Sequence, residues 1–563
     1  MLVSTNIDVL VEHLQRQAPQ VQFRLHPSGY RFTSPNDDLR PSVTWPAAMV
    51  RCESRLSGDL EQALAVRDVE RLNEDLGRLI GAYTVIVILR DAVHIWSSLV
   101  KESDIFWSAS AAGMIISDNI GVIRSLSREF KAEPTLNVQY CTDGVLGEDA
   151  FGTETIFSGI HHVPLGTRTS ISVDGKVEVQ AIPLPEKDNP LDAIAEHLTG
   201  SRHSSGPQPI LMFSGGLDSS SILYACKEAG MSPVLIHVLN HEDRTATELP
   251  TAQRIASGWG FDLQVIEKPP LTSYAPNRAR KLDASIQSPF EVNPIFFFLN
   301  DEAHLEDRAA NLGISTCVTG FGGDDVFGQN PSTNVTIDAY RRGGVHAALS
   351  ECLKYSTLKG RSFAPDAWAA ARKLLGVTPI EDGYRPPDWF ASRSALERRD
   401  EHPWSRDHMN TPAKRAHLRG ILRAAYSCSN ARQSPLLYVT PMVSQAVVGG
   451  VFRKDVADLY DSKFDRIILR QSLFQRSGSE IAWRRSKRSS SNFVFEFLTN
   501  NRDELHDYIV DGRVAKSMNV DRTGLKNSLE YCCSAGINND LPLLFSLLRL
   551  EIFHRHVASV RSR

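Results

Sequence analysis

The feature that most constrains this chain is a glycine-rich loop between an apolar run and a helical pattern. The loop reads SGGLDSS at residues 214–220. It follows the apolar run 209–213 and precedes the helical pattern 219–230. Its glycines permit a tight turn and let backbone N–H groups approach an anion, and the helix directs its positive end to the same point. This order predicts a phosphate-binding loop. The predicted phosphate ligands are Ser214, Gly215, Gly216 and Ser219.

A carboxylate, Asp218, lies inside this loop. Beside a polyphosphate a carboxylate is repulsive unless a divalent cation lies between the two, so the loop predicts Mg²⁺ together with the phosphates. No lysine follows the glycines, which separates the loop from the GxxxxGK[ST] type. The alternative is an ordinary strand-to-helix turn in which serine and aspartate cap the helix.

A second glycine-rich loop reads TGFGGDDVFG at residues 319–328 and follows the short apolar run 315–318. It contains two adjacent carboxylates. A second acidic loop facing the first would complete a Mg²⁺ site that bridges the phosphates. The alternative is a glycine-rich turn whose aspartates are solvated.

The order of the remaining patterns predicts an α/β protein with two domains. Residues 1–185 are rich in β-branched runs and carry a hairpin signal at Asp174-Gly175. Residues 186–208 follow Pro185, begin with charged residues, carry a short amphipathic piece and end in serine, glycine and proline, which predicts an interdomain linker. Residues 209–563 alternate strands with helices and then become mostly helical. This alternation predicts a parallel sheet with a helical extension.

Composition narrows the class of protein further. Hydrophobic residues make up 42% and charged residues 23%, as in a globular domain, and the net charge of -4 gives no pull toward nucleic acid. The chain shows no secretory signal and no apolar run near the ~20 residues of a membrane helix. The eight cysteines show no metal-ligand spacing, which indicates reduced thiols and predicts a cytoplasmic protein.

At residues 214–220 the chain resembles the PP-loop ATP pyrophosphatases, which cleave ATP between the α- and β-phosphates and adenylate a substrate. The loop at 319–328 is similar to that of the asparagine synthetase branch of this superfamily. The resemblance implies that Thr319 and Gly320 flank the nucleotide and that ATP and Mg²⁺ are the cofactors. The metal ligands that it implies are Asp218 and Asp324.

The string GGDDVF at residues 322–327 looks most like the lasso-peptide cyclases, which are macrolactam synthetases of this branch. Asparagine synthetases carry a glutamate between the glycines of the loop and β-lactam synthetases a tyrosine, whereas this chain has Phe321. Phenylalanine cannot take a proton, so the chain lacks the base of either group. A free α-amine has a pKa near 7.7–8.0 and needs positioning more than deprotonation.

The resemblance implies an ATP-dependent amide ligase. It would adenylate an Asp or Glu side chain of a leader-processed core peptide, and the N-terminal amine of the peptide would close an isopeptide macrolactam with release of AMP and pyrophosphate. The substrate would be the precursor peptide, and the participation of a leader peptidase and a leader-binding protein stays open. One alternative is a β-lactam-synthetase-like ligase of a small amino acid. Another is an inactive nucleotide-binding scaffold.

A basic segment reads RRSKRSSS at residues 484–491 and resembles the late region of the branch in which a lysine reaches the reaction centre. Lys487 matches that catalytic lysine. A positive charge there would stabilise the tetrahedral intermediate and the departing pyrophosphate. The alternative is a solvated basic loop or a patch for an acidic partner.

The N-terminal region resembles the glutaminase domain of the glutamine-dependent members, an Ntn-type sandwich. The resemblance rests on Gly81–Tyr83 and on the string IHHVPLG at residues 160–166. That domain uses an N-terminal cysteine, whereas this chain starts with Met1 and its first cysteine is Cys52. The resemblance therefore implies an inactive amidotransferase-like domain at 1–185, followed by the linker and a synthetase domain at 209–563.

Overall fold

Alternating apolar side chains build the N-terminal part from two antiparallel sheets, of strand order β1-β8-β7-β9 and β11-β10-β6-β5-β4. These strands are β1 (Leu2–Ser4), β4 (Ala47–Cys52), β5 (Tyr83–Ile88), β6 (Ala92–Ser97), β7 (Phe106–Ser110), β8 (Gly113–Ser117), β9 (His161–His162), β10 (Thr167–Ser172) and β11 (Val177–Ala181), beside a separate hairpin of β2 (Arg24–His26) and β3 (Gly29–Arg31). The hairpin predicted around Asp174-Gly175 is confirmed, because β10 and β11 pair antiparallel on either side of it.

The structure is a computed structural model. It describes residues 2–4, 24–26, 29–31, 47–52, 69–78, 81–89, 92–100, 104–110, 113–129, 134–146, 151–172, 174–205, 208–239, 248–267, 286–295, 303–378, 387–390, 402–407, 411–428, 436–485, 491–518, 520–535 and 540–559.

The two N-terminal sheets face each other. Ile86 of β5 and Trp107 of β7 belong to one buried cluster between the sheets, whereas the preceding residues, Val85 and Phe106, belong to clusters on the outer faces. Successive side chains of a strand point to opposite faces, so each sheet has one face toward the other sheet and one covered by helices. The covering helices are α3 (Val69–Gly77) on one side and α4 (Ile120–Glu129) and α5 (Val138–Val145) on the other.

The C-terminal part contains the predicted parallel sheet, with the order β14-β13-β12-β15-β16. Its strands are β12 (Ile210–Met212), β13 (Val234–Leu239), β14 (Leu263–Glu267), β15 (Thr316–Val318) and β16 (Leu437–Val439). All neighbouring strands pair parallel. The prediction of a parallel α/β sheet is confirmed. Sequence reasoning missed β16, since three residues inside a helical region give no period of their own.

Most of the predicted linker at 186–208 is helical, where the sequence predicted only a short amphipathic piece. Helix α6 (Pro190–Ser205) buries Leu191, Ile194 and Leu198 in the core around the parallel sheet. Its second half is rich in serine and glycine and reads as a loop in the sequence, but tertiary packing of its first half holds the helix. The domain boundaries stay predictions.

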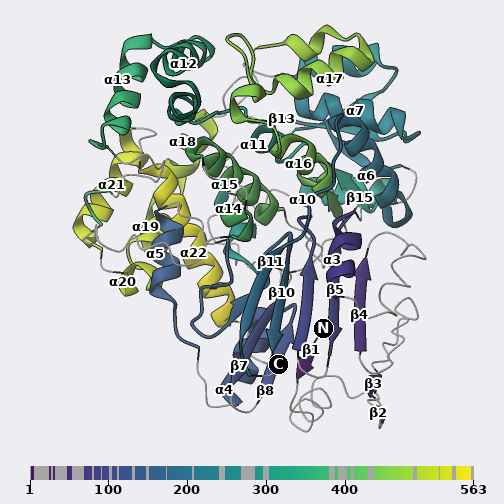
Figure 1. The fold of residues 1–563 in the computed structure, drawn as a ribbon, viewed down its shortest axis with the longest axis vertical. Coiled ribbons are helices and arrows are strands. Elements are labelled where there is room, and N and C mark those ends of the chain that lie inside the picture. Colours follow the sequence, from purple (N-terminus) through teal and green to yellow (C-terminus); the bar gives the residue numbers. More distant parts are fainter. Residues whose placement is uncertain are drawn as a thin grey trace.

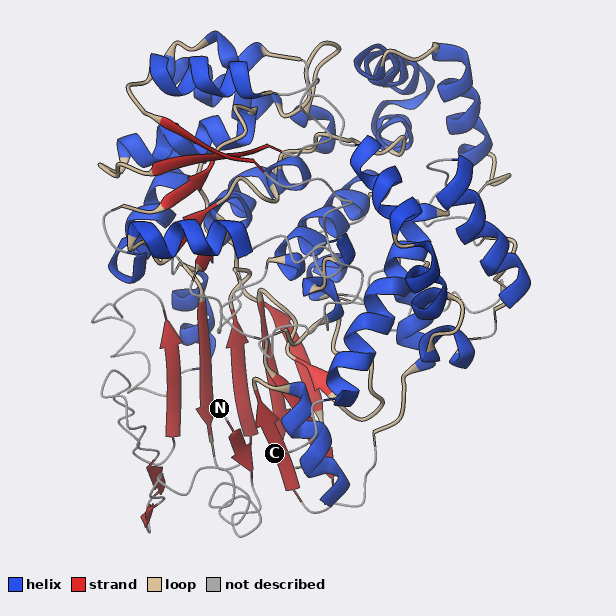
Figure 2. Ribbon diagram, turned by 180° about the vertical axis from the view of Figure 1, so that it is seen from behind, coloured by secondary structure: helices blue, strands red, loops and turns tan. Residues whose placement is uncertain are grey.

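Helices occupy most of the remaining chain and surround the parallel sheet, as Figures 1 and 2 show. They are α7 (Leu217–Glu228), α8 (Leu249–Gly258), α10 (Ala303–Leu312), α11 (Gly323–Val326), α12 (Val335–Lys359), α13 (Phe363–Leu374), α14 (Pro403–Asp407), α15 (Pro412–Ser427), α16 (Gln445–Phe452) and α17 (Ile467–Ser477). Short 3-10 turns are η3 (Pro289–Glu291), η4 (Pro441–Val443), η5 (Val456–Leu459) and η6 (Glu480–Trp483).

The last helices return to the N-terminal part. They are α18 (Ser491–Asn500), α19 (Arg502–Ile509), α20 (Arg513–Ser517), α21 (Arg522–Ala535) and α22 (Leu541–Ser559). Leu547 and Phe553 of α22 share one buried cluster with Ile123 of α4 and Cys141 of α5, so the helical extension covers the outer face of an N-terminal sheet (Figure 1). Within the described residues, no helix is both long and apolar enough to cross a membrane.

Candidate active site

The predicted phosphate loop turns from β12 into α7 and is pressed against α8. Gly215 has φ 73°, and a Cβ there would lie 2.8 Å from the Cα of Ala252, so the turn requires glycine. Ser214 Oγ lies 3.2 Å from Ser219 Oγ and accepts the Gly216 N–H at 3.3 Å. Gly216 caps α7 without a side-chain acceptor, so the first N–H groups of the helix suit an anion.

The two predicted loops follow neighbouring strands, β12 and β15, at the point where the winding of the sheet reverses. Open α/β sheets bind ligands at this switch point. A Cβ on Gly323 would lie 2.7 Å from Asp218 Oδ1, and one on Gly320 would lie 3.1 Å from the Asp218 Cβ. The structure therefore brings the two loops into contact, with Thr319 and Gly320 beside Asp218 at the end of β15.

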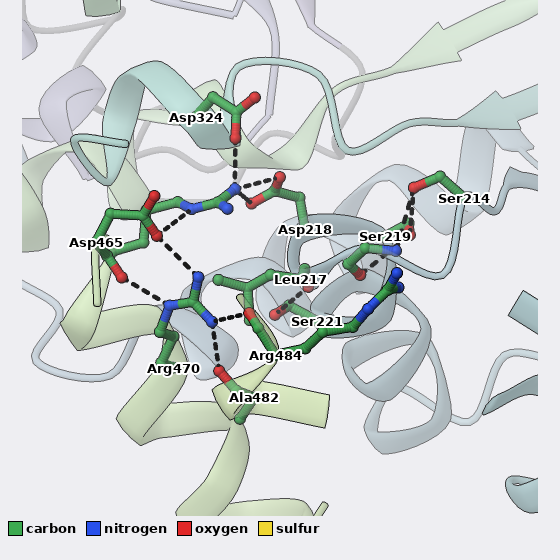
Figure 3. A network of polar contacts seen from close by, with 12 residues as sticks. Ser214, Leu217, Asp218, Ser219, Ser221, Asp324, Asp465, Arg470, Ala482 and Arg484 are labelled. Atoms are coloured by element: carbon green, nitrogen blue, oxygen red, sulfur yellow. Dashed lines mark hydrogen bonds and ion pairs between the residues drawn. The ribbon is translucent and has the colours of Figure 1, made fainter. Parts of the chain in front are cut away.

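A third element, the segment before α17, supplies a cation to both loops. Arg466 Nη1 donates to Asp218 Oδ2 at 2.8 Å and also bonds Asp324 Oδ1. Figure 3 shows the carboxylates of Asp218 and Asp324 converging on the same nitrogen atom. The Arg466 side chain is 6% exposed, that of Asp218 16% and that of Asp324 37%. Burial acts to lower the pKa of Arg466, and the carboxylates of Asp218 and Asp324 raise it by more, so the guanidinium stays charged.

Arg466 is held in an unusual backbone conformation. Its φ of 51° is positive, which no other non-glycine residue in the described ranges shows. Such a conformation costs on the order of 1–3 kcal/mol and persists where the surroundings fix it. Arg470 fixes it from the first turn of α17: its Nη2 donates to Asp465 Oδ1 at 2.8 Å and its Nε to the Asp465 carbonyl at 2.7 Å.

Polar side chains of Gln329 and His417 hydrogen-bond the acidic loop at residues 319–328. With its amide nitrogen toward the loop, Gln329 donates to both carboxylate oxygens of Asp324 at 2.7 Å. His417 Nε2 donates to the Val326 carbonyl at 2.8 Å. Burial raises the pKa of the Asp325 carboxyl to about 6, against the opposing field of Arg423. The Asp325 carboxyl lies beside Gly420 of α15, where a Cβ would be 3.4 Å from its Oδ1, whereas the carboxylate of Asp324 bonds Arg466.

The start of the predicted basic segment is anchored next to the same site. Arg470 Nη1 donates to the carbonyl oxygens of Ala482 at 2.6 Å and Arg484 at 3.0 Å. The Arg484 guanidinium pairs with Glu248 at the start of α8, the helix that packs against the phosphate loop. Lys487 lies outside the described residues, so its predicted role stays a prediction.

The residues present fit a Mg²⁺ ion that binds with a nucleotide. Asp218 and Asp324 reach one nitrogen atom of Arg466 from opposite loops, so oxygens of both can also approach one cation. Within the described ranges, no three Asp, Glu, His or Cys side chains cluster as a metal site. Mg²⁺ accepts one or two protein carboxylates when phosphates and water complete its shell. The donor set suits that arrangement.

Sequence reasoning gave the two acidic loops but missed Arg466 and Arg470. The available signal was the string DRIILR at residues 465–470. In it, an aspartate and an arginine stand at the start of a helical pattern and a second arginine follows one turn later, which indicates a charged turn. The pairing of Arg466 with Asp218, 248 residues away, requires the tertiary structure.

The comparison with known families agrees with this geometry. A family described as Asparagine synthase matches residues 200–555 of the chain. The chain belongs to the asparagine synthase family. It is accordingly an ATP-dependent amide ligase. The synthase match begins within α6 and includes every strand of the parallel sheet.

Among curated proteins, this asparagine synthase family member is similar to the microcin J25-processing protein McjC of Escherichia coli. The two are 23% identical over 497 residues, which are 88% of this chain and 89% of that protein. Two solved structures also match: the allosteric regulatory enzyme of purine biosynthesis (8% identity, 39% of this chain, 59% of that chain) and glutamine PRPP amidotransferase from B. subtilis (9%, 56% and 70%). Both have a TM-score of 0.16, which is too low to support a conclusion about the fold.

Proposed function

We propose that this chain is an ATP- and Mg²⁺-dependent lasso peptide cyclase. The carboxylate of an Asp or Glu side chain in a leader-processed core peptide attacks the α-phosphate of ATP, which gives an acyl-adenylate and pyrophosphate. The N-terminal amine of the peptide then attacks the acyl carbon, and AMP leaves as the isopeptide macrolactam forms. The main support for the proposal is that the carboxylates of Asp218 and Asp324 both pair with Arg466 at the switch point of the parallel sheet. The similarity to McjC supports a peptide substrate.

The phosphate loop binds the triphosphate in this proposal. Backbone N–H groups at Gly215 and Gly216 and the hydroxyls of Ser214 and Ser219 face the phosphate oxygens. Asp218 and Asp324 would hold Mg²⁺, which would supply neutralisation of the phosphate charge when bound. Thr319 and Gly320 flank the nucleotide at the end of β15. The pairing of Arg484 with Glu248 closes the entrance between α8 and the basic segment.

Arg466 places a permanent positive charge beside the leaving pyrophosphate. Its guanidinium already lies between the two carboxylates that hold Mg²⁺, and buried donors that need no reorganisation stabilise developing charge most effectively. Lys487 adds a second positive charge at the adenylate in this proposal, which rests on the resemblance of residues 484–491 to the late basic region of the branch. Two cations then share the negative charge of the transition state.

The attacking amine needs positioning rather than a strong base. Phe321 is 47% exposed at the tip of the acidic loop and offers an apolar surface, not a proton acceptor. An α-amine with a pKa near 7.7–8.0 is partly neutral near pH 7, so holding it close to the acyl carbon is sufficient.

We also propose that residues 1–185 form a glutaminase-like domain of Ntn type. Its two facing antiparallel sheets with helices on both outer sides support this proposal. The domain would serve as a scaffold or as a docking surface for the peptide, for a leader peptidase or for a leader-binding protein. A reducing cytoplasmic setting suits the cysteines, since those the structure describes with their side chains are buried and free.

The test of the proposed function is a product analysis with matched variants. The chain, ATP, Mg²⁺ and a leader-processed precursor peptide should give AMP, pyrophosphate and a peptide one water lighter. Asp218→Asn and Asp324→Asn should each lower the ATP–pyrophosphate exchange rate by at least ~100-fold, because each removes a carboxylate that would hold Mg²⁺ beside the phosphates. Asp192→Asn, a change of an exposed carboxylate, is the control.

Two outcomes would contradict the proposal in different ways. Formation of ADP instead of AMP would refute adenylation altogether. Exchange that needs a small β-amino acid and ignores the peptide would keep adenylation and replace the substrate class.

A further inference from the structure

Arg470 is a buried charged residue one helical turn after Arg466. Its side chain is 5% exposed, and its backbone N–H donates to the Arg466 carbonyl at 3.1 Å. A guanidinium presents five N–H donors in a planar fork. Four hydrogen bonds of this fork reach two segments of the chain. Two end on Asp465, and the others end on the backbone carbonyls of Ala482 and Arg484 (Figure 3). Arg470 therefore links the turn before α17 to the start of the basic segment.

On the side of the turn, Arg470 and Arg466 share one carboxylate. Asp465 Oδ1 accepts Arg470 Nη2 at 2.8 Å and Arg466 Nε at 3.4 Å. Arg466 in turn bonds both Asp218 and Asp324. The positive φ of Arg466 makes its backbone conformation costly unless neighbouring groups hold it. The bonds from Arg470 to Asp465 therefore help to set the direction from which the Arg466 guanidinium enters the site.

On the side of the basic segment, Arg470 fixes the direction of the backbone. Leu473 and Ala482 are buried in the core around the parallel sheet, so apolar packing already holds α17 and η6. Such packing is non-directional, whereas hydrogen bonds have preferred angles. The bonds of Arg470 to the carbonyls of Ala482 at 2.6 Å and Arg484 at 3.0 Å orient the peptide groups through which the chain leaves η6. Three residues of chain span at most about 11 Å, so this anchor limits where Lys487 can reach.

An aromatic ring makes a second contact between the same two segments. The Phe464 ring centroid lies 5.3 Å from the guanidinium carbon of Arg470 and 5.0 Å from that of Arg485. Trp483 packs on the same ring, with the two centroids 5.1 Å apart. A guanidinium over an aromatic face is attracted by the ring. Because Phe464 directly precedes Asp465 and Arg485 belongs to the basic segment, the ring holds the two segments together at another point.

The two linked segments contain the two cations of the proposed reaction. Arg466 pairs with the carboxylates of both loops, and Lys487 follows Arg484 by three positions in the sequence. Donors stabilise developing charge best when they are held in place before the reaction. A misplacement of about 1 Å can lower a rate by about 100-fold. A rigid link between the segments would keep both cations aligned with the same phosphate group.

We propose that Arg470 is a positioning residue that holds Arg466 and the basic segment in one fixed arrangement. The proposal rests on the adenylation reaction proposed above and adds the residue that aligns its two cations. Arg470 acts through the two segments and not by contact with the substrate. Its role requires the planar fork and not the charge alone, because a lysine ammonium is a point charge that cannot reproduce the geometry of the fork.

The first measurement is trypsin cleavage of the full chain, which requires no enzymatic activity. In Arg470→Lys the bond between Arg485 and Ser486 should be cut at least ~10-fold faster than in the wild type, because the segment opens more often without the carbonyl contacts. Phe464→Leu, which removes the ring and keeps the fork, should accelerate cleavage less. Arg476→Lys, a change of a 40% exposed arginine on α17, is the matched control and should leave the cleavage rate unchanged.

The second measurement is ATP–pyrophosphate exchange with Mg²⁺ and the leader-processed peptide. Arg470→Lys should lower the maximal exchange rate by ~100-fold and change the KM for ATP by less than ~3-fold, because the phosphate loop still binds the nucleotide. In Arg470→Ala, free guanidinium ion should raise the exchange rate at least ~10-fold, since it can restore the bonds of the fork. Methylammonium, which has the charge without the fork, should not.

Contrary results would have distinct meanings. Wild-type cleavage in Arg470→Lys would show that the fork does not hold the basic segment, and wild-type exchange in that variant would show that a charge alone is sufficient. Either result would overturn the proposal. A raised KM for ATP at an unchanged maximal rate would assign Arg470 to nucleotide binding instead. A wild type without exchange would refute the proposed function, and the trypsin comparison would still decide whether Arg470 holds the segment.

Discussion

Arg466 gives the sharpest test of the candidate site, because its guanidinium separates two carboxylates that would otherwise repel each other. In Arg466→Met the carboxylates of Asp218 and Asp324 face each other without a cation. At roughly 5 Å and an effective dielectric constant of ~20, their repulsion is about 3 kcal/mol. Asp324 is 37% exposed, so solvent screening lowers this to about 2 kcal/mol.

The effect of Asp324→Asn on the free energy of unfolding is expected to have opposite signs in the wild type and in Arg466→Met. Asp324→Asn should lower the free energy of unfolding in the wild-type background, since Arg466 loses a charged partner. The same change should raise it by about 2 kcal/mol in Arg466→Met, because it removes the repulsion. Mg²⁺ without nucleotide should stabilise Arg466→Met more than the wild type, since the cation can then take the place of the guanidinium. Urea unfolding followed by circular dichroism measures all of these free energies.

The matched control is Arg476→Met on the same helix, α17. Its guanidinium is 40% exposed and pairs at the surface, so its removal should cost less than about 1 kcal/mol. If Asp324→Asn destabilises the wild type and Arg466→Met equally, the two carboxylates do not meet across Arg466, and the reasoning about the site is refuted.

Three further predictions concern the catalytic segment, the loop and the pH dependence of stability. Lys487→Met should lower the ligation rate by ~100-fold with little change in ATP affinity, measured by single-turnover kinetics, whereas a merely solvated lysine would change neither. Gly215→Ala should destabilise the protein by about 2–4 kcal/mol, because it combines positive φ with a clash on the backbone of α8, whereas Gly230→Ala, with φ 67° and open space around it, should cost about 1 kcal/mol; equal losses in thermal unfolding would contradict the close packing. Burial lowers the pKa of His197 from 6.5 to about 4, so below pH 6.5 the unfolded chain takes up a proton that the native state refuses, and this stability, present above 6.5, is lost as the pH falls. The loss is about 2 kcal/mol at about pH 5, and His197→Leu should show a smaller drop in urea stability between about pH 7.5 and 5; an unchanged drop would show that His197 is not its source.

The sequence by itself determined the local chemistry of this protein. Positive φ and close packing demand glycine at Gly215, and a carboxylate in a phosphate loop demands a cation, so both loops could be predicted from their residue types. The run before each loop was long and apolar enough to predict β12 and β15. Local pattern therefore predicted the parallel sheet and the carboxylates of the candidate site.

The tertiary structure decided which of these pieces meet. Strand order is a long-range property, and neither loop encodes that β12 and β15 are neighbours. The pairing of Arg466 with Asp218 joins residues 248 positions apart, and α6 is held as a helix by the core it covers. Contacts of this kind depend on closing long stretches of chain, whose cost depends on the whole fold rather than on any local run. For this reason the carboxylates of Asp218 and Asp324 could be predicted from the sequence, whereas only the fold shows that the Arg466 guanidinium pairs with both of them.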